Sequence, residues 1–211
     1  VQIKAAGLCH SDLVAINGER AKPVPMVIGH EASGIVSKVG PDVDDLAVGD
    51  HVVPVYVANC GRCDMCQEGR PALCQPATIA NKAGTLIDGT TRLHSDGQII
   101  FHHSGVAAFS EYAVISQNAL VRIDPEIPFE VAALFGCAVV TGVGSVVNTA
   151  STEISTIADN LASTVIVLSV SFNMYESAVN VSVNVSNRYE STDTDFVNSI
   201  FKHNPQSYSR L

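Results

Sequence analysis

Four cysteines within fifteen positions constrain this chain more than any other feature of its sequence. Cys60, Cys63, Cys66 and Cys74 are separated by two, two and seven residues. Spacings of two residues place successive sulfurs around one metal more naturally than they pair them in disulfides. Four thiolates leave no open coordination position, which is typical of a structural Zn²⁺ site that holds a long loop in place. We call residues 60–74 the four-cysteine lobe.

Two alternatives to zinc compete for these cysteines. An iron–sulfur cluster also uses Cys-x2-Cys-x2-Cys, but bacterial ferredoxins continue with a cysteine three residues later and then proline, whereas seven residues precede Cys74 here. An even total of six cysteines allows a disulfide framework, but such frameworks dominate small secreted domains that lack a core. A chain of 211 residues can build a core. We therefore expect reduced thiolates and a cytoplasmic location.

The charge balance excludes two classes of partner. Twelve Lys and Arg against 21 Asp and Glu give a formal net charge of -9, which repels nucleic acid phosphates and anionic lipid surfaces. With 46% hydrophobic residues but no run of 18 apolar ones, the composition is typical of a globular chain without a membrane span. The expected partners are small molecules, with neither nucleic acid nor membrane.

The pattern of turns and apolar residues predicts a mainly β fold that ends in helices. Up to Leu120, short β-rich runs at residues 34–39, 51–57 and 110–115 alternate with turn residues, which favours a barrel or sandwich. From Pro128 the spacing becomes helical, with an interruption at Gly136. We expect helices near residues 128–150.

A change in composition predicts a domain boundary near residue 150. All 15 glycines lie at or before Gly144, and residues 151–211 are rich in Ser, Asn, Val and Thr. Without glycine, this tail cannot form the tight phosphate-binding turn of a nucleotide-binding unit. We leave residues 151–211 unassigned, as a disordered or frameshifted tail. The chain also starts at Val1, inside a strand-like run, so its amino terminus is expected to be cut.

A second set of metal-binding residue types is dispersed along the chain. Cys9, His30 and Cys137 offer two thiolates and one imidazole, a set known from catalytic zinc sites that keep a fourth position open for water or substrate. Taken singly, each is also an ordinary buried cysteine or a hydrogen-bonded core histidine. Spacing alone leaves both interpretations open.

Several ordered motifs resemble one known family. The stretch GHEASGIVSKVGPDV at 29–43 matches G-H-E-x2-G-x5-G-x2-V, the zinc signature of medium-chain, zinc-dependent alcohol dehydrogenases. Further segments follow the same family in the same order: GLCHSDL at 7–13, the four-cysteine lobe, GTLIDGTTRL at 84–93, HHSGVAAFSEYAV at 102–114 and GCAVVTGVGSVVNTA at 136–150. The resemblance covers residues 1 to about 150. It implies an incomplete GroES-like catalytic domain, a barrel with a zinc lobe.

The resemblance also assigns metal ligands. It implies a catalytic Zn²⁺ held by Cys9, His30 and Cys137, with Glu31 behind the metal. It implies a structural Zn²⁺ held by all four cysteines of the four-cysteine lobe. The first metal would be open to substrate and the second closed.

Residues around the catalytic metal receive roles from the same resemblance. Ser11 would hydrogen-bond the alcohol and accept its proton, and Asp12 would orient His30. His10 would face the cofactor pyrophosphate, with a solvated imidazole as the competing interpretation. Thr141 would pack near the nicotinamide.

Four further positions bear on the site. Tyr56 and His103 would line the substrate pocket, although plain packing competes as an explanation for both. Val14 stands where the family commonly has the histidine that completes its proton relay. His51 is not that histidine, because it lies in a predicted strand, and we interpret it as a surface residue.

The implied function is hydride transfer between a primary or aryl alcohol and NAD, by a zinc-dependent alcohol dehydrogenase that forms homo-oligomers. The alternative is a truncated, catalytically inactive zinc-binding remnant. It arises because the family continues with a Rossmann unit whose Gly-rich turn binds the dinucleotide, and residues after 150 lack such a turn.

Overall fold

The computed structural model of the protein describes residues 1–149. They fall into two units, which are taken separately: residues 1–137 and a second unit that begins at Ala138. The predicted tail, residues 151–211, lies outside the described residues. No helix among residues 1–149 is long and apolar enough to cross a bilayer.

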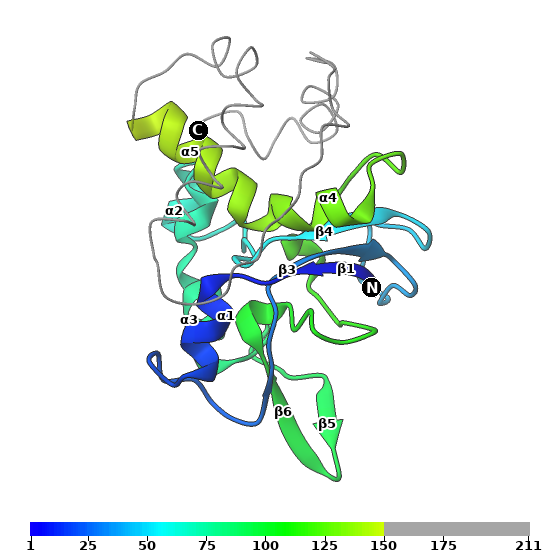
Figure 1. Cartoon of the computed structure of the whole chain (residues 1–211), viewed down its shortest axis with the longest axis vertical. Coiled ribbons are helices and arrows are strands. Elements are labelled where there is room, and N and C mark those ends of the chain that lie inside the picture. Colours follow the sequence, from blue (N-terminus) through cyan, green and yellow to red (C-terminus); the bar gives the residue numbers. More distant parts are fainter. Residues whose placement is uncertain (150–211) are drawn as a thin grey trace. The chain divides into compact units, whose positions relative to one another are not determined.

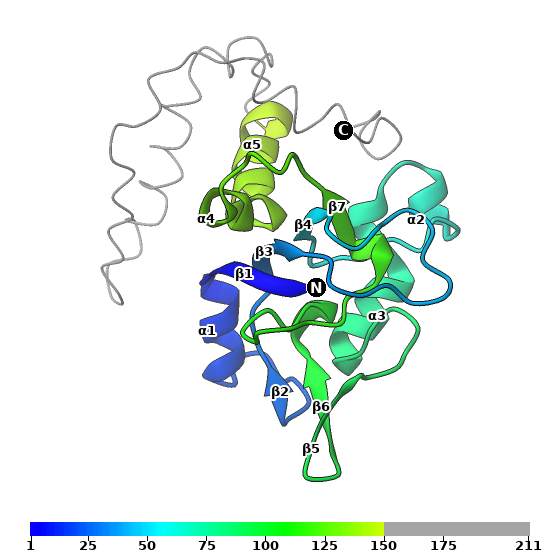
Figure 2. The same cartoon turned by 90° about the vertical axis from the view of Figure 1, so that its right-hand side faces the viewer.

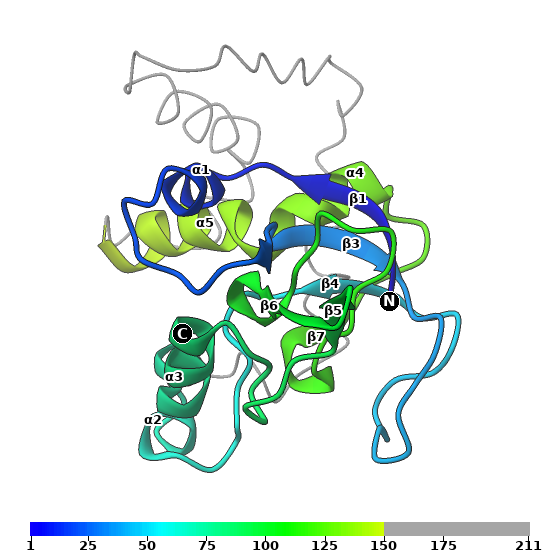
Figure 3. The same cartoon turned by 90° about the horizontal axis from the view of Figure 1, so that it is seen from below.

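A four-stranded antiparallel sheet forms the framework of the first unit (Figure 1). In spatial order its strands are β1 (Gln2–Gly7), β3 (Glu31–Ile35), β4 (His51–Pro54) and β7 (Leu120–Arg122). Figure 3 shows β3 between β1 and β4. This central strand is buried along nearly its whole length, and its small residues let β1 come close. A side chain at Gly34 would collide with the backbone carbonyl of Gln2.

A smaller sheet brings two distant segments side by side. It consists of β2 (Met26–Val27), β6 (Gln98–His102) and β5 (Leu93–Ser95). Figure 2 shows β2 beside β6, with the β5–β6 hairpin extending away from the larger sheet. The β2–β6 pairing is parallel, and further backbone hydrogen bonds join the residues that follow the two strands. The amides of Ala108 and Phe109 donate to the carbonyls of Gly29 and Ile28, at 3.0 and 2.9 Å.

Two helices that the sequence analysis did not predict interrupt the mainly β region. They are α1 (His10–Ile16) and α3 (Gln75–Ala83); a short helix, α2 (Asp64–Gln67), and a 3₁₀ turn, η1 (Pro71–Leu73), lie between them. Residues at the ends of α1 and α3 explain why these two helices form. The Asp12 carboxylate accepts the amide of Cys9 at the start of α1. Helix α3 has Pro76 in its first turn and ends at Gly84, whose φ is 70°.

The other elements match the sequence predictions in type more closely than in length. Strands β3 and β4 overlap the predicted runs 34–39 and 51–57, but residues 110–115 form only an isolated bridge between Gln2 and Tyr112. The predicted helices near 128–150 are confirmed. They are α4 (Phe129–Ala132), the 3₁₀ turn η4 (Ala133–Gly136) and, in the second unit, α5 (Ala138–Thr149).

His51 is not the surface residue that the sequence suggested. Its ring lies against that of Phe129, with 4.7 Å between the ring centroids. Its Nδ1 atom is buried. The position of His51 in a strand did not reveal that Phe129 of α4 covers it.

Candidate metal centres

The four-cysteine lobe gathers its thiols around one point. The sulfurs of all four cysteines lie within 4.8 Å of one another, and none is in a disulfide. The Sγ atoms of Cys60 and Cys66 are 3.9 Å apart, and those of Cys63 and Cys74 are 4.0 Å apart. A tetrahedron of zinc–sulfur bonds of about 2.3 Å has sulfurs roughly 3.8 Å apart. The spacing of the thiols therefore fits a Zn²⁺ ion.

The surroundings of these thiols favour a bound cation. The backbone N–H groups of Arg62 and Cys63 face the Cys60 sulfur and lower its pKa to about 6. Burial and the Cys63 side chain raise the pKa of Cys66 to about 12. Thiols this close cannot all ionise without a compensating positive charge, and a divalent metal provides it.

A second centre combines residues from three places in the first unit. Cys9 precedes α1, His30 and Glu31 stand at the start of β3, and Cys137 follows η4. One ligand atom from each of the four lies within 4.8 Å of those of the others. We call these four residues the mixed centre. The structure thus brings together the dispersed residues whose meeting the sequence left open.

Close backbone packing brings the ligands of the mixed centre together. The pairing of β1 with β3 places Gly7 opposite Glu31, so that Cys9 emerges beside His30. Gly136 lies directly on the backbone carbonyl of Pro54, and any side chain at position 136 would collide with that oxygen. Cys137 therefore reaches the centre because residue 136 has no Cβ.

Asp12 orients the histidine of the mixed centre. Its Oδ1 atom lies 3.0 Å from Nδ1 of His30, which leaves Nε2 of that ring as the nitrogen available to a metal. The same carboxylate accepts the amides of Cys9 and Gly29, at 3.0 and 3.2 Å. The role predicted for Asp12 therefore has a matching contact.

The ligand groups of the mixed centre shift one another's pKa values. Contacts with Cys137 and His30 lower the pKa of Cys9 to about 3. Burial and the nearby Cys9 sulfur raise the pKa of Glu31 to about 7. The contact with Cys9 together with burial also raises the pKa of Cys137. Two sulfurs, one imidazole and a reserve carboxylate form a donor set that suits zinc and balances its charge.

The remaining predicted residues surround the centre to different degrees. Ser11 is exposed, and both its amide and its hydroxyl contact the Cys9 sulfur. The Tyr56 and His103 rings stand edge-on to His30, with centroids 6.1 and 5.3 Å away. His10 is exposed on α1, so its proposed contact with a cofactor stays a prediction.

Thr141 falls in α5 of the second unit, where it is exposed. Its predicted place near the nicotinamide also stays a prediction.

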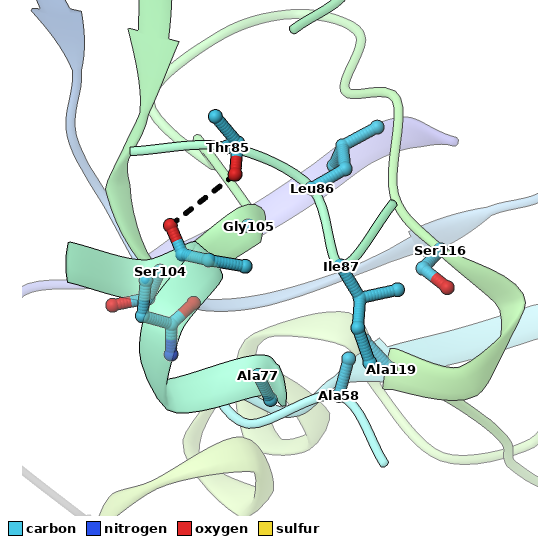
Figure 4. Close-up of a pocket in the computed structure, with 11 residues that line it drawn as sticks. Ala58, Ala77, Thr85, Leu86, Ile87, Ser104, Gly105, Ser116 and Ala119 are labelled. Carbon is cyan, nitrogen blue, oxygen red and sulfur yellow. Dashed lines mark hydrogen bonds between the residues drawn. The ribbon is translucent and has the colours of Figure 1, made fainter. Parts of the chain in front are cut away.

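The cavity beside α3 does not offer a substrate site. Its volume of about 10 Å³ suits at most one water molecule. Figure 4 shows it enclosed by small and apolar side chains, among them Ala58, Ala77, Leu86 and Ala119. It does not include any residue of the mixed centre.

One contact was missed at the sequence level. His103 was expected only to line a pocket, but its Nδ1 atom lies 3.1 Å from Oδ1 of Asp12. No spacing rule links residues 12 and 103. The pairing of β2 with β6 brings them together, and the sequence does not reveal that pairing.

Known proteins are similar to part of this chain in both sequence and fold. Residues 1–125 match the family described as "Alcohol dehydrogenase GroES-like domain". An S-(hydroxymethyl)glutathione dehydrogenase of Escherichia coli O1:K1 / APEC is 40% identical over 154 residues, which make up 72% of this chain and 42% of the relative.

Two solved structures are similar. An alcohol dehydrogenase zinc-binding domain protein from Burkholderia ambifaria has 38% identity and a TM-score of 0.66, over 71% of this chain and 40% of that one. Benzyl alcohol dehydrogenase from Acinetobacter calcoaceticus has 34% identity and a TM-score of 0.60, over 70% and 40%.

These comparisons confirm the family resemblance, the GroES-like fold and the expected zinc cofactor, for which the four-cysteine lobe supplies a site. The chain spans about 40% of the length of the relatives just described. The family match covers more than half of the chain. The chain therefore belongs to the alcohol dehydrogenase GroES-like domain family.

Proposed function

We propose that this chain forms the metal-binding catalytic part of a zinc-dependent alcohol dehydrogenase that transfers hydride between a primary or aryl alcohol and NAD. The observation that carries the proposal is the convergence of Cys9, His30 and Cys137 within 4.8 Å, beside Glu31. Three protein ligands leave a fourth position for an alcohol oxygen. The four-cysteine lobe, which has no open position, serves stability.

The residues around the mixed centre can prepare the alcohol for the reaction. When bound, Zn²⁺ would supply Lewis acidity that lowers the pKa of the alcohol, and a nicotinamide would be the hydride acceptor. Ser11 is exposed beside the Cys9 sulfur, where its hydroxyl can accept a hydrogen bond from the alcohol and pass the proton to water. Val14 of α1 stands where the family commonly has the histidine of its proton relay. Water therefore carries the proton away from Ser11 in this chain.

The aromatic wall of the centre supports aryl alcohols as substrates. Tyr56 is 40% exposed and stands edge-on to His30, which puts an aromatic ring beside the centre for a flat substrate to pack against. The similar protein from Acinetobacter calcoaceticus is a benzyl alcohol dehydrogenase.

The proposal also includes three further properties. They are a domain boundary near residue 150, a homo-oligomeric state and a cytoplasmic location.

Cobalt spectroscopy tests for an open metal position. With Co²⁺ in both sites of the full chain, adding benzyl alcohol should shift the visible absorption of the mixed centre because an alcohol oxygen enters its coordination sphere. The closed four-cysteine lobe should not respond. Cys9→Ser should abolish the response while the spectrum of the lobe remains.

An unchanged spectrum at saturating alcohol would contradict the proposal and favour the alternative function, a zinc-binding remnant without substrate. Cys60→Ser is the matched control, because it removes a thiolate from the other site. It should leave the alcohol-induced shift in place.

A further inference from the structure

We propose that His103 is a positioning residue of the mixed centre: its Nδ1 atom holds the Asp12 carboxylate and so fixes the ring of His30. This inference rests on the proposed function, because it concerns the metal centre on which that function depends. It assigns His103 a role beyond lining the substrate pocket.

The Asp12 carboxylate is the hub of four polar contacts. The residue is fully buried. Its Oδ2 accepts the Cys9 amide, and its Oδ1 accepts the Gly29 amide and lies 3.0 Å from Nδ1 of His30. Nδ1 of His103 approaches the same Oδ1 at 3.1 Å. Two histidines therefore share one carboxylate oxygen.

The Nδ1 atom of His103 has a close polar neighbour in Asp12. That atom is buried, and within the described part of the chain it makes no straight hydrogen bond. Asp12 Oδ1 lies 3.1 Å away but off the direction of the ring N–H, so the contact is a polar one with a bent donor angle. The contacts with His103 and His30 oppose the effect of burial and hold the pKa of Asp12 well below its usual value.

The backbone around His103 is built to hold this ring in place. His103 opens the 3₁₀ turn η2 (His103–Gly105), and its carbonyl accepts the amides of Val106 and Ala107. Ser104 and Ala107 have φ values of 53° and 57°, a left-handed conformation that costs free energy for residues other than glycine. Such conformations persist where the surroundings over-determine them.

Backbone pairing joins the same segment to the residues that precede the metal ligand His30. Val27 pairs with His102 in the small sheet, and the Ala108 amide donates to the Gly29 carbonyl at 3.0 Å. His103 and His30 therefore belong to two hydrogen-bonded stretches, and their rings meet edge-on at 88°. Pocket lining alone would not require a buried nitrogen to face Asp12.

Two variants of the full chain separate positioning from packing. His103→Phe keeps a flat ring but removes the donor, whereas His103→Asn keeps an amide donor near the place of Nδ1. We expect H103F to weaken Zn²⁺ binding at the mixed centre about 10- to 100-fold, because residues that orient a metal ligand contribute on that scale. H103N should stay within about threefold of the native affinity, since it can still bond the carboxylate.

The measurements are zinc affinity against a competing chelator and the ¹⁵N chemical shifts of His30, which report its tautomer. The zinc of the four-cysteine lobe serves as an internal measure of folding, and H94F, the same change on an exposed histidine of β5, is the control. H103F should keep the lobe zinc, bind the second ion weakly and show a mixture of His30 tautomers.

Different outcomes separate this inference from the proposed function. Native affinity and a single His30 tautomer in H103F would overturn the inference and leave the function standing. A native chain that binds only one zinc would overturn both. If H103F loses both ions, H103N decides: native-like affinity supports the donor role, and a selective loss of the second ion contradicts it.

Discussion

Replacing Cys63 with serine is expected to unfold the four-cysteine lobe while the four-stranded sheet stays intact. The lobe contains a four-residue helix and a three-residue 3₁₀ turn, and Leu73 is 49% exposed, so little apolar packing supports it. Structural zinc contributes on the order of 10 to 16 kcal/mol in small zinc-binding peptides, and here it replaces the missing core. Hydrogen exchange should show near-complete loss of amide protection across residues 60–74.

The control for this variant is Asp64→Ser, which changes an exposed residue in the same helix without removing a ligand. Protection of the lobe should then be native. A chelator should reproduce the effect of C63S, and so should a decrease in pH, because protons compete with zinc for the thiolates. Full protection of residues 60–74 in metal-free C63S would show that packing, and not zinc, holds the lobe.

Asp12→Ala is expected to destabilise the first unit and to weaken the mixed centre. The substitution leaves two buried imidazoles and the amides of Cys9 and Gly29 without their acceptor. Removing one partner from a buried ionic cluster typically costs about 3 to 5 kcal/mol. Urea denaturation at pH 7 measures the free energy of unfolding, and zinc affinity should fall about 10- to 100-fold in parallel.

The pH dependence of this loss has a defined sign. The pKa of Asp12 is lowered in the folded protein, from an unfolded value of about 3.9. Its contribution is therefore complete above roughly pH 5 and disappears as the pH falls through the folded pKa. The difference in stability between the native chain and D12A should shrink in acid.

Asp88→Ala is the matched control for D12A. Asp88 forms an ion pair with Arg92 at 3.0 Å, but both side chains are about half exposed. Such surface pairs contribute roughly 0 to 1 kcal/mol. If D12A and D88A lost similar amounts of stability, the carboxylate of Asp12 would not be the hub that its contacts indicate.

The structure brings together the residues of both predicted metal sites, whereas the helices near them were not all predicted from the sequence. Closely spaced ligands such as those of residues 60–74 identify a site because their chemistry is local. The mixed centre required a family resemblance, since Cys9 and Cys137 meet only after β1, β3 and η4 have packed. Helix α1 was not predicted, because the residues at its start, Cys9 to Asp12, also form part of a ligand motif.

Other features depended on contacts that no local pattern encodes. His103 reaches Asp12 through the parallel pairing of two-residue β2 with β6, which is too short to leave a periodic signal. His51 was assigned to the surface as a strand residue, but Phe129 of α4 covers it. In both cases tertiary packing overrode the local pattern.

The zinc content of the purified chain tests the central claim most directly. Two centres on one chain predict two equivalents of tightly bound zinc, and Cys137→Ser should reduce this to one while the four-cysteine lobe keeps its ion. One equivalent in the native chain, unchanged in C137S, would contradict the claim that Cys9, His30 and Cys137 form a metal site.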